Sequence, residues 1–351
     1  MSNQVHRVGM IRNAKIRTSK NGSRFLQGEI HLQNTSSSIA FKMWNYQEKD
    51  PIKNGAYEVY GHLDKFNGKD QMIASKVQAR DDIHIQDFMP KAPFDFKVEE
   101  VQEEFVSRIN MISSPEIRTW VIACIIACKH PWLTWRERFK ESSEFLRNNM
   151  NSGSPVSMTV SMLKETPFNK AWAATRNHHA YNHGLIIHTN EVIRVALSMY
   201  LAIGHGYTLN EDIFGSMQGQ QDVVLAGSIL HDIGKVYENN VQNSSYEKTN
   251  LGILYTNDLD ITSTFVSNIF NMISDSNTSD NVHHMYMHVM KCIHGHHGQY
   301  GNQLPNTIPS LCVSYADGSA AHLAWVRDEI LKGDPKPYVK GSNNISFKEK
   351  I

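Results

Sequence analysis

Histidine and aspartate residues that could bind a metal ion are concentrated in one part of this chain of 351 residues. Of its 18 histidines, 13 lie between His178 and His322. The most distinctive segment is LAGSILHDIGK (residues 225–235), where an apolar helical pattern delivers the adjacent pair His231 and Asp232. Neighbouring helix residues point about 100° apart, so one ion fits in the notch between the two side chains. Imidazole nitrogen and carboxylate oxygen together suit Zn²⁺, Mn²⁺, Fe²⁺ or Co²⁺.

Three other short motifs supply further potential ligands, one before this pair and two after it. They are HHAYNHGLIIHT with His188, HGHHG with His296 and His297, and SYADGSA with Asp317. The glycines that flank the two adjacent histidines of HGHHG indicate a tight loop that lets the backbone approach a ligand closely. For His178, His179 and His183, two roles are open, lining the pocket and hydrogen bonding at the start of a helix.

Taken in order, these motifs resemble those of the HD-domain phosphohydrolases, whose pattern is a histidine, a His-Asp pair and a distant aspartate. The resemblance implies that a divalent metal ion is held by His188, His231, Asp232 and Asp317. The alternative is that these residues are helix caps and hydrogen-bonded core histidines. A lone His-Asp pair would be weak support for a metal site, whereas four elements in the right order with HDIGK intact are specific.

A bound divalent ion lowers the pKa of water to about 7 and neutralises charge that develops on phosphate oxygens, so the resemblance implies hydrolysis of phosphate esters. Asp232 could bridge a second ion or accept a proton from the attacking water. Lys235 follows His231 by one helical turn and is the candidate for stabilising phosphate charge. The alternative for Lys235 is a solvated cation at a helix end. His296 and His297 are candidates for protonating the leaving group or for binding metal.

One departure from the family pattern affects the number of metal ions. The family has a Gly-His pair after the loop that follows HDIGK, but here TNLGILYTNDLDI (249–261) has no histidine. Asp258 or Asp260 could substitute as an oxygen ligand, which favours Mn²⁺ or Mg²⁺. Alternatively, one ion is bound and His296 or His297 contacts the substrate phosphate. We expect one firm site with Mn²⁺ as the first choice over Co²⁺, Fe²⁺, Zn²⁺ and Mg²⁺, and a second, weaker site is doubtful.

The N-terminal part of the chain, residues 1–85, is predicted to form a five-stranded OB-fold β-barrel. Turn signals such as Asn21–Gly22 and Asn67–Gly68 separate segments rich in apolar and β-branched residues. The predicted strands are 8–18, 25–34, 39–44, 57–63 and 71–78. Residues 1–80 hold 13 Lys or Arg against 6 Asp or Glu, and the rest hold 22 against 29. This asymmetry favours a polyanion-binding module, with a chance surface bias as the alternative.

Three residues of this barrel are candidates for binding nucleic acid. The strand period of two places Leu26 inside and Phe25 outside, and Trp44 and Lys42 likewise point outward. A basic groove with aromatic platforms is typical of OB-folds that bind single strands. The alternative is that the aromatic rings close the barrel ends or dock against the second domain.

After a linker at residues 86–97, the pattern becomes helical. Apolar residues at three- and four-residue spacing predict helices at 98–112, 116–129 and 135–149. We therefore expect an α+β multidomain protein, in which an all-α HD-domain helical bundle spans 98–333 and a polar tail spans 334–351.

The sequence also resembles the bacterial OB-plus-HD 3′-to-5′ exoribonucleases of the YhaM type, from about residue 5 to about residue 330. GSRFLQGEIHLQNTSSSIAFKMWN and VYGHLDKFNGKDQM look like their OB domain, and the HD motifs occur in the same order. The resemblance implies a metal-dependent phosphodiesterase and exonuclease acting on single-stranded RNA or DNA and releasing nucleoside monophosphates. The alternatives are an HD phosphohydrolase acting on a nucleotide or a cyclic or oligonucleotide signal, and a catalytically weakened single-strand-binding protein.

The sequence has few features that would direct the chain to a membrane or an oxidising compartment. The N-terminus lacks an apolar signal core, and the longest apolar stretch is too short to span a bilayer. Four cysteines are too few for a disulfide scaffold. We expect a cytoplasmic protein with no membrane partner, whose apolar helical faces would also allow a homo-oligomer.

Overall fold

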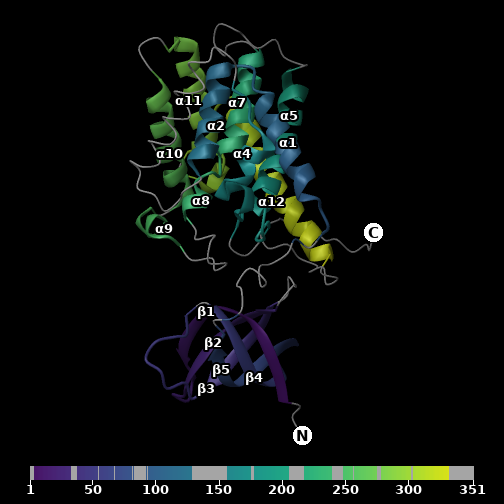
Figure 1. Cartoon of the computed structure of the whole chain (residues 1–351), viewed down its shortest axis with the longest axis vertical. Coiled ribbons are helices and arrows are strands. Elements are labelled where there is room, and N and C mark those ends of the chain that lie inside the picture. The colour runs from purple at the N-terminus through teal and green to yellow at the C-terminus, as the bar shows by residue number, and fades with distance from the viewer. Residues whose placement is uncertain are drawn as a thin grey trace. The chain divides into compact units, whose positions relative to one another are not determined.

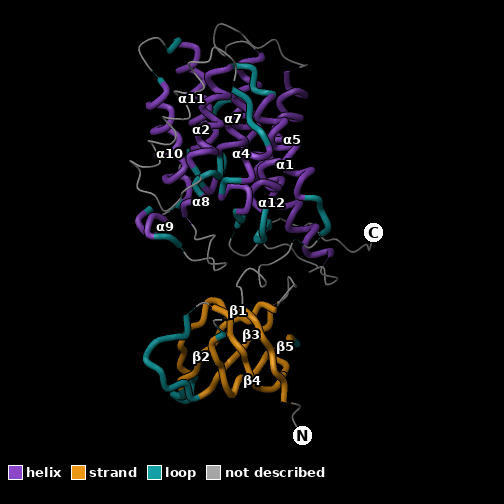
Figure 2. Tube along the Cα trace, in the orientation of Figure 1, coloured by secondary structure: helices purple, strands orange, loops and turns teal. Residues whose placement is uncertain are grey.

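The computed structural model contains a β unit followed by a helical unit, so the α+β class is confirmed (Figures 1 and 2). Each unit is described by itself. The described residues are 4–32, 38–53, 55–66, 68–80, 82, 92, 94–128, 156–174, 178–204, 217–238, 248–255, 257–274, 278–301 and 303–331. The predicted helix at 135–149, the polar tail at 334–351 and most of the predicted linker lie outside these residues.

Five strands close into a barrel in the order β1-β2-β3-β5-β4. They are β1 (Gln4–Thr18), β2 (Arg24–Leu32), β3 (Ser38–Trp44), β4 (Gly55–Phe66) and β5 (Lys69–Ala79), which cover the five predicted segments except for residues 33 and 34, outside the described residues. β3 and β5 pair in parallel, and the other neighbours pair antiparallel. The period of two holds on β2, because Leu26 and Ile30 are fully buried together with Phe41, Val59 and Met72.

The HD motifs lie in or directly beside the described helices of the second unit. They are α1 (Val98–Asn110), α2 (Pro115–Ala127), α4 (Val160–Lys164), η2 (Pro167–Lys170), α5 (Gly184–Gly204), α7 (Met217–Leu230), α8 (Lys235–Glu238), α9 (Asn250–Leu254), α10 (Asp258–Ile273), α11 (Asp280–Gly295), η3 (Gly298–Tyr300) and α12 (Ile308–Leu331). Helices α1 and α2 confirm two of the predicted helices. Helices α5, α7, α11 and α12 pack against one another and form the frame that positions the motifs.

Helix α2 is a central element of this bundle, because every residue from Trp120 to Ala127 is apolar and buried. Ser114 caps its N-terminus by accepting a hydrogen bond from the Ile117 amide, and Pro115 occupies the first helical position, which suits the missing amide proton. The Trp120 indole donates a hydrogen bond to the Val266 carbonyl of α10 at 3.2 Å. This hydrogen bond holds α10 against α2.

By length and composition alone, helix α5 is long and apolar enough to cross a membrane. Within the helical unit, however, 56% of its most apolar window is buried, as in a core helix. The helix also carries His188 toward the other motifs, so its apolar length is explained by packing.

Candidate metal centre

Four side chains from three parts of the bundle converge at one point. His188 comes from α5, His231 and Asp232 from the turn after α7, and Asp317 from α12. His188 Nε2 lies 3.0 Å from Asp317 Oδ1, 3.4 Å from His231 Nε2 and 3.6 Å from Asp232 Oδ2. His231 Nε2 lies 3.3 Å from Asp232 Oδ2. Two ligand atoms of a tetrahedral ion with bonds of about 2.0–2.1 Å are about 3.3–3.4 Å apart, so this cluster fits one divalent ion.

The HDIGK segment lies in a turn, whereas the apolar sequence pattern predicted that its His-Asp pair is part of a helix. Helix α7 ends at Leu230, and a turn over 231–234 leads into α8. Gly234 is required there, because a Cβ atom would lie 2.3 Å from Thr262 Oγ1 and 2.5 Å from the Asp258 carbonyl oxygen. The close approach brings the start of α10, and with it Asp258, beside Lys235.

Hydrogen bonds to the backbone fix the ring orientation of two histidines. His231 Nδ1 donates to the Ser228 carbonyl at 2.7 Å, and His296 Nδ1 donates to the Ile293 carbonyl at 2.6 Å. Each bond places the ring proton on Nδ1 and leaves the lone pair on Nε2 directed into the cluster. This is the arrangement that metal-binding histidines use.

The buried carboxylates stay ionised in spite of their burial. Burial alone would raise the pKa of Asp232, but the positive charge of Lys235 opposes it, and the pKa is held well below its usual value. Burial likewise opposes ionisation of Asp317, and the hydrogen bond from His188 lowers its pKa. Burial lowers the pKa of His296 to about 3, so this ring stays neutral. Ionised carboxylates and neutral imidazoles are the forms that bind metal.

A second group of potential ligands consists of Asp232, His296 and His297, whose ligand atoms lie within 4.8 Å of one another. Asp232 Oδ1 and His296 Nε2 are 3.7 Å apart, and both atoms are buried without a hydrogen-bond partner among the described residues. Buried polar atoms without partners are costly, which points to a ligand at this position. Asp232 therefore directs one oxygen toward each group and could bridge two ions.

Lys235 lies where the sequence predicts, on the same side as the His-Asp pair. Its Nζ donates to Asp232 Oδ2 at 2.6 Å and lies 3.9 Å from Asp258 Oδ2. Burial would lower the pKa of Lys235, but the two carboxylates outweigh it and raise the pKa, so the ammonium keeps its charge. Asp258, one of the two suggested substitutes for the absent histidine, is thus linked to Asp232 through Lys235.

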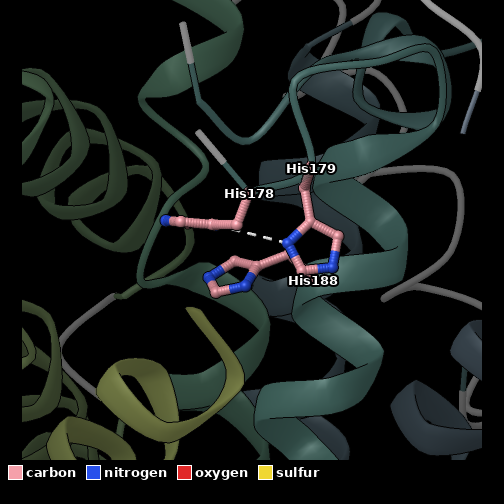
Figure 3. Close-up of side chains that lie close together, drawn as sticks. All are labelled: His178, His179 and His188. Atoms are coloured by element: carbon pink, nitrogen blue, oxygen red, sulfur yellow. Dashed lines mark hydrogen bonds between the residues drawn. The ribbon is translucent and has the colours of Figure 1, made fainter. Parts of the chain in front are cut away.

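A third group of close imidazoles consists of His178, His179 and His188 (Figure 3). His178 Nδ1 lies 3.3 Å from His179 Nδ1. His183 has a different role, because its Nδ1 contacts the Asn169 carbonyl at 2.6 Å. His183, directly before helix α5, therefore has the hydrogen-bonding role that the sequence left open.

The candidate nucleic-acid-binding residues of the barrel are only partly as predicted. Trp44 is 42% exposed, but Phe25 is only 9% exposed, so the expectation that Phe25 lies on the outer surface is wrong. Phe25 pairs with Trp44 across β2 and β3, and their ring centroids are 4.8 Å apart. The Lys42 ammonium lies 5.8 Å from the Phe25 ring and 4.6 Å from that of Phe66, which is 58% exposed. Sequence reasoning missed Phe66, whose position just before the Asn67–Gly68 turn was the available signal.

The chain is similar to several known proteins, although no family model matches it. The chain is 26% identical over 227 residues to the 3′-5′ exoribonuclease YhaM of Oceanobacillus iheyensis, covering 63% of this chain and 55% of the relative. It is 24% identical to YhaM of Listeria monocytogenes, covering 63% and 56%. It is 28% identical over 183 residues to the dihydroneopterin 2′,3′-cyclic phosphate phosphodiesterase of Methanocaldococcus jannaschii, covering 51% and 60%.

These relatives confirm the resemblance to HD-domain proteins of the YhaM type. The matched region spans little more than half the length of the two YhaM proteins.

Proposed function

We propose that this protein is a metal-dependent phosphodiesterase that degrades single-stranded nucleic acid as a 3′-to-5′ exoribonuclease and releases nucleoside monophosphates. One observation carries the proposal. His188, His231, Asp232 and Asp317 converge at spacings that fit one divalent ion, and the second oxygen of Asp232 faces His296. The relatives named as 3′-5′ exoribonucleases support the reaction, its direction and RNA as the substrate.

A divalent ion in this site would supply an activated water molecule and would neutralise phosphate charge. The side chains around the ion would accept a proton and stabilise charge. Asp232 is placed to accept a proton, because it lies between the two groups of ligands. Lys235 holds a positive charge beside Asp232, where it stabilises negative charge that develops on a phosphate. His296 and His297 lie on the other side of Asp232, next to the position of a second ion or of the leaving group.

We propose Mn²⁺ as the metal, bound firmly by the first four ligands. Neutral imidazoles combined with carboxylates suit Mn²⁺, although Co²⁺, Fe²⁺, Zn²⁺ and Mg²⁺ are also compatible with this ligand set. A second and weaker ion would use Asp232, His296 and His297, and Asp258 would supply a further oxygen if Lys235 moved.

We propose that the barrel is an OB-fold domain, at residues 1–85, that binds the strand. Its strand order and its exposed Trp44 and Phe66 beside Lys42 support this role, because aromatic faces stack with bases and cations pair with phosphates. The helical HD domain would occupy 98–333. A cytoplasmic location and a homo-oligomer are further proposals, which cell fractionation and light scattering would test.

The test uses end-labelled single-stranded RNA and DNA, each incubated with Mn²⁺, Mg²⁺ or a chelator. We expect stepwise shortening of RNA from its 3′ end with Mn²⁺ and none with chelator. His231→Ala and Asp232→Ala should abolish cleavage and leave strand binding nearly unchanged. His284→Ala, which changes an exposed histidine of α11, is the matched control. Cleavage at the parental rate by both site variants would show that the metal mechanism is wrong.

A second candidate function is hydrolysis of a cyclic or other small nucleotide. The relative named as a 2′,3′-cyclic phosphate phosphodiesterase favours it, since its identity to the chain is as high as that of the exoribonucleases. Faster hydrolysis of a 2′,3′-cyclic nucleotide than of an RNA oligomer would support this function instead. Strand binding without any hydrolysis would indicate the third alternative, a catalytically weakened binding protein.

A further inference from the structure

A row of four polar side chains, formed by Arg327, Glu191, His179 and His178, ends beside the proposed metal ligands. Arg327 of α12 donates to Glu191 of α5 at 3.0 Å. The other oxygen of Glu191 lies 3.0 Å from His179 Nε2. His179 Nδ1 in turn lies 3.3 Å from His178 Nδ1. The mechanism proposed above uses none of these four residues.

The chemistry of each group fixes where the ring protons lie. Arg327 can only donate, and an ionised Glu191 can only accept, so the Glu191 oxygen 3.0 Å away favours a proton on His179 Nε2, which has no other polar partner among the described residues. His179 is fully buried, which disfavours a second ring proton. Its Nδ1 therefore accepts the proton of His178 Nδ1, and His178 is left with an unprotonated Nε2.

The backbone is held in an unusual conformation to make this arrangement. The backbone of His179 has a φ of 54°, in the left-handed region that residues other than glycine rarely adopt. Its carbonyl accepts a hydrogen bond from the Ala173 amide at 3.2 Å. Gly184 leaves room for that carbonyl, because a Cβ atom there would lie 2.0 Å from its oxygen. Strained backbone of this kind is concentrated at functional sites.

The free nitrogen of His178 is placed to meet a substrate. The ring of His178 lies over that of His188, with centroids 5.5 Å apart, and its remaining nitrogen points away from His179 (Figure 3). His178 is partly exposed, whereas His179 and His188 are fully buried, so of the three only His178 is open to a ligand.

A nitrogen lone pair at this position needs a partner that carries a proton. A phosphodiester oxygen has none and would be repelled, whereas the ribose of a bound nucleotide offers hydroxyl protons next to the phosphate. We propose that His178 Nε2 accepts a hydrogen bond from a ribose hydroxyl of the nucleotide held at the metal centre. His179 and Glu191 are the positioning residues. This inference rests on the proposed function and adds a determinant of preference for ribose ends.

The experiment combines one residue change with one substrate change. RNA oligomers ending in an ordinary nucleotide, a 2′-deoxynucleotide or a 3′-deoxynucleotide are cleaved with Mn²⁺ by the parental protein and by His178→Phe, which keeps an aromatic ring without the acceptor. We expect the parental protein to cleave the ordinary end faster than the deoxy end that lacks the hydroxyl bound by His178. The difference should be about three- to tenfold in kcat/KM, the value of one neutral hydrogen bond. His178→Phe should cleave all three ends at the same, lower rate.

Glu191→Gln tests the row of side chains, because an amide offers only one oxygen to the two donors. If Arg327 keeps that oxygen, the amide NH₂ donates to His179 Nε2. The ring proton of His179 then lies on Nδ1 and that of His178 on Nε2, so the preference for the ordinary end should fall. Glu104→Gln is the matched control, because Glu104 also pairs with an arginine, Arg194. This control should keep the full preference.

The possible failures are distinguishable. If the parental protein cleaves none of the oligomers, the proposed function is wrong. If it cleaves all three ends equally, or if His178→Phe keeps the preference, the role of His178 is overturned while the nuclease function stands. Equilibrium Mn²⁺ binding is measured in parallel, and loss of the tight ion in His178→Phe would also overturn the inference, because His178 would then be a metal ligand.

Discussion

Replacing Gly234 by alanine should destabilise the helical unit through one well-defined contact. The new Cβ atom would lie 2.3 Å from Thr262 Oγ1, 2.5 Å from the Asp258 carbonyl oxygen and 2.8 Å from the Thr262 amide nitrogen. Two of these three atoms belong to the backbone of α10, so no side-chain rotation relieves the clash. The start of α10 must move away from the turn, and the hydrogen bond from the Gly234 amide to Thr262 Oγ1, 2.9 Å long, is lost.

The expected magnitude follows from these two effects and one that opposes them. Overpacking a tight site costs about 1–3 kcal/mol. The lost hydrogen bond costs about 1 kcal/mol. Alanine restricts the unfolded chain more than glycine does, which returns about 0.4–1 kcal/mol. We therefore expect the free energy of unfolding to fall by about 1–3.5 kcal/mol.

Gly318→Ala is the matched control, because Gly318 lies within α12, beside Asp317. Apart from its chain neighbours and its own helix backbone, no atom of the described residues lies within 4 Å of its hypothetical Cβ. This change should stabilise the helix by about 0.5–1 kcal/mol. Urea unfolding of the metal-free proteins, followed by far-UV circular dichroism, measures both variants. Equal stability of Gly234→Ala and the parental protein would refute the close approach of α10 to the HDIGK turn.

Three further outcomes are expected. Trp44→Ala should weaken single-strand binding by roughly 1–3 kcal/mol in a fluorescence titration, whereas Leu63→Ala, which removes an exposed side chain that cannot stack, should not; equal losses would exclude stacking. Asp258→Asn should keep one tight Mn²⁺ and lose the weaker one in equilibrium dialysis, and unchanged stoichiometry would exclude Asp258 as a ligand. Burial alone would raise the pKa of Glu191, but His179 and Arg327 lower it from 4.5, so Glu191 adds stability above pH 4.5 that is lost as the pH falls. Acid unfolding of Glu191→Gln should therefore show a weaker pH dependence below pH 4.5, and an identical slope would contradict this.

The barrel was predictable from sequence because each strand alternates and ends at a turn signal. The same alternation puts Phe25 on the outer side of the barrel but did not predict that its ring is buried there. In the structure the neighbouring Trp44 ring and the Lys42 side chain lie against it, so it is buried on the outer side. Period indicates the direction of a side chain but not what a neighbouring strand places over it.

Prediction from sequence was limited in a similar way at the site in the helical unit. His188, His231, Asp232 and Asp317 were recognisable because their order along the chain is specific, and the structure brings them together. Nothing in the sequence links Glu191 with Arg327, however, because their contact depends on how α5 packs against α12. Residues that orient a site from another helix carry no local signal.

The charges around Asp232 bear on how many ions the centre holds. With its histidines neutral, the centre has three carboxylates, Asp232, Asp258 and Asp317, and one ammonium, Lys235. The net charge of −2 is balanced by one divalent ion. A second divalent ion would leave an excess of +2 in a largely buried site, and such an excess is costly unless anions accompany it. Substrate phosphate and a deprotonated water are such anions, so the second ion should bind more tightly when a strand is present than when it is absent.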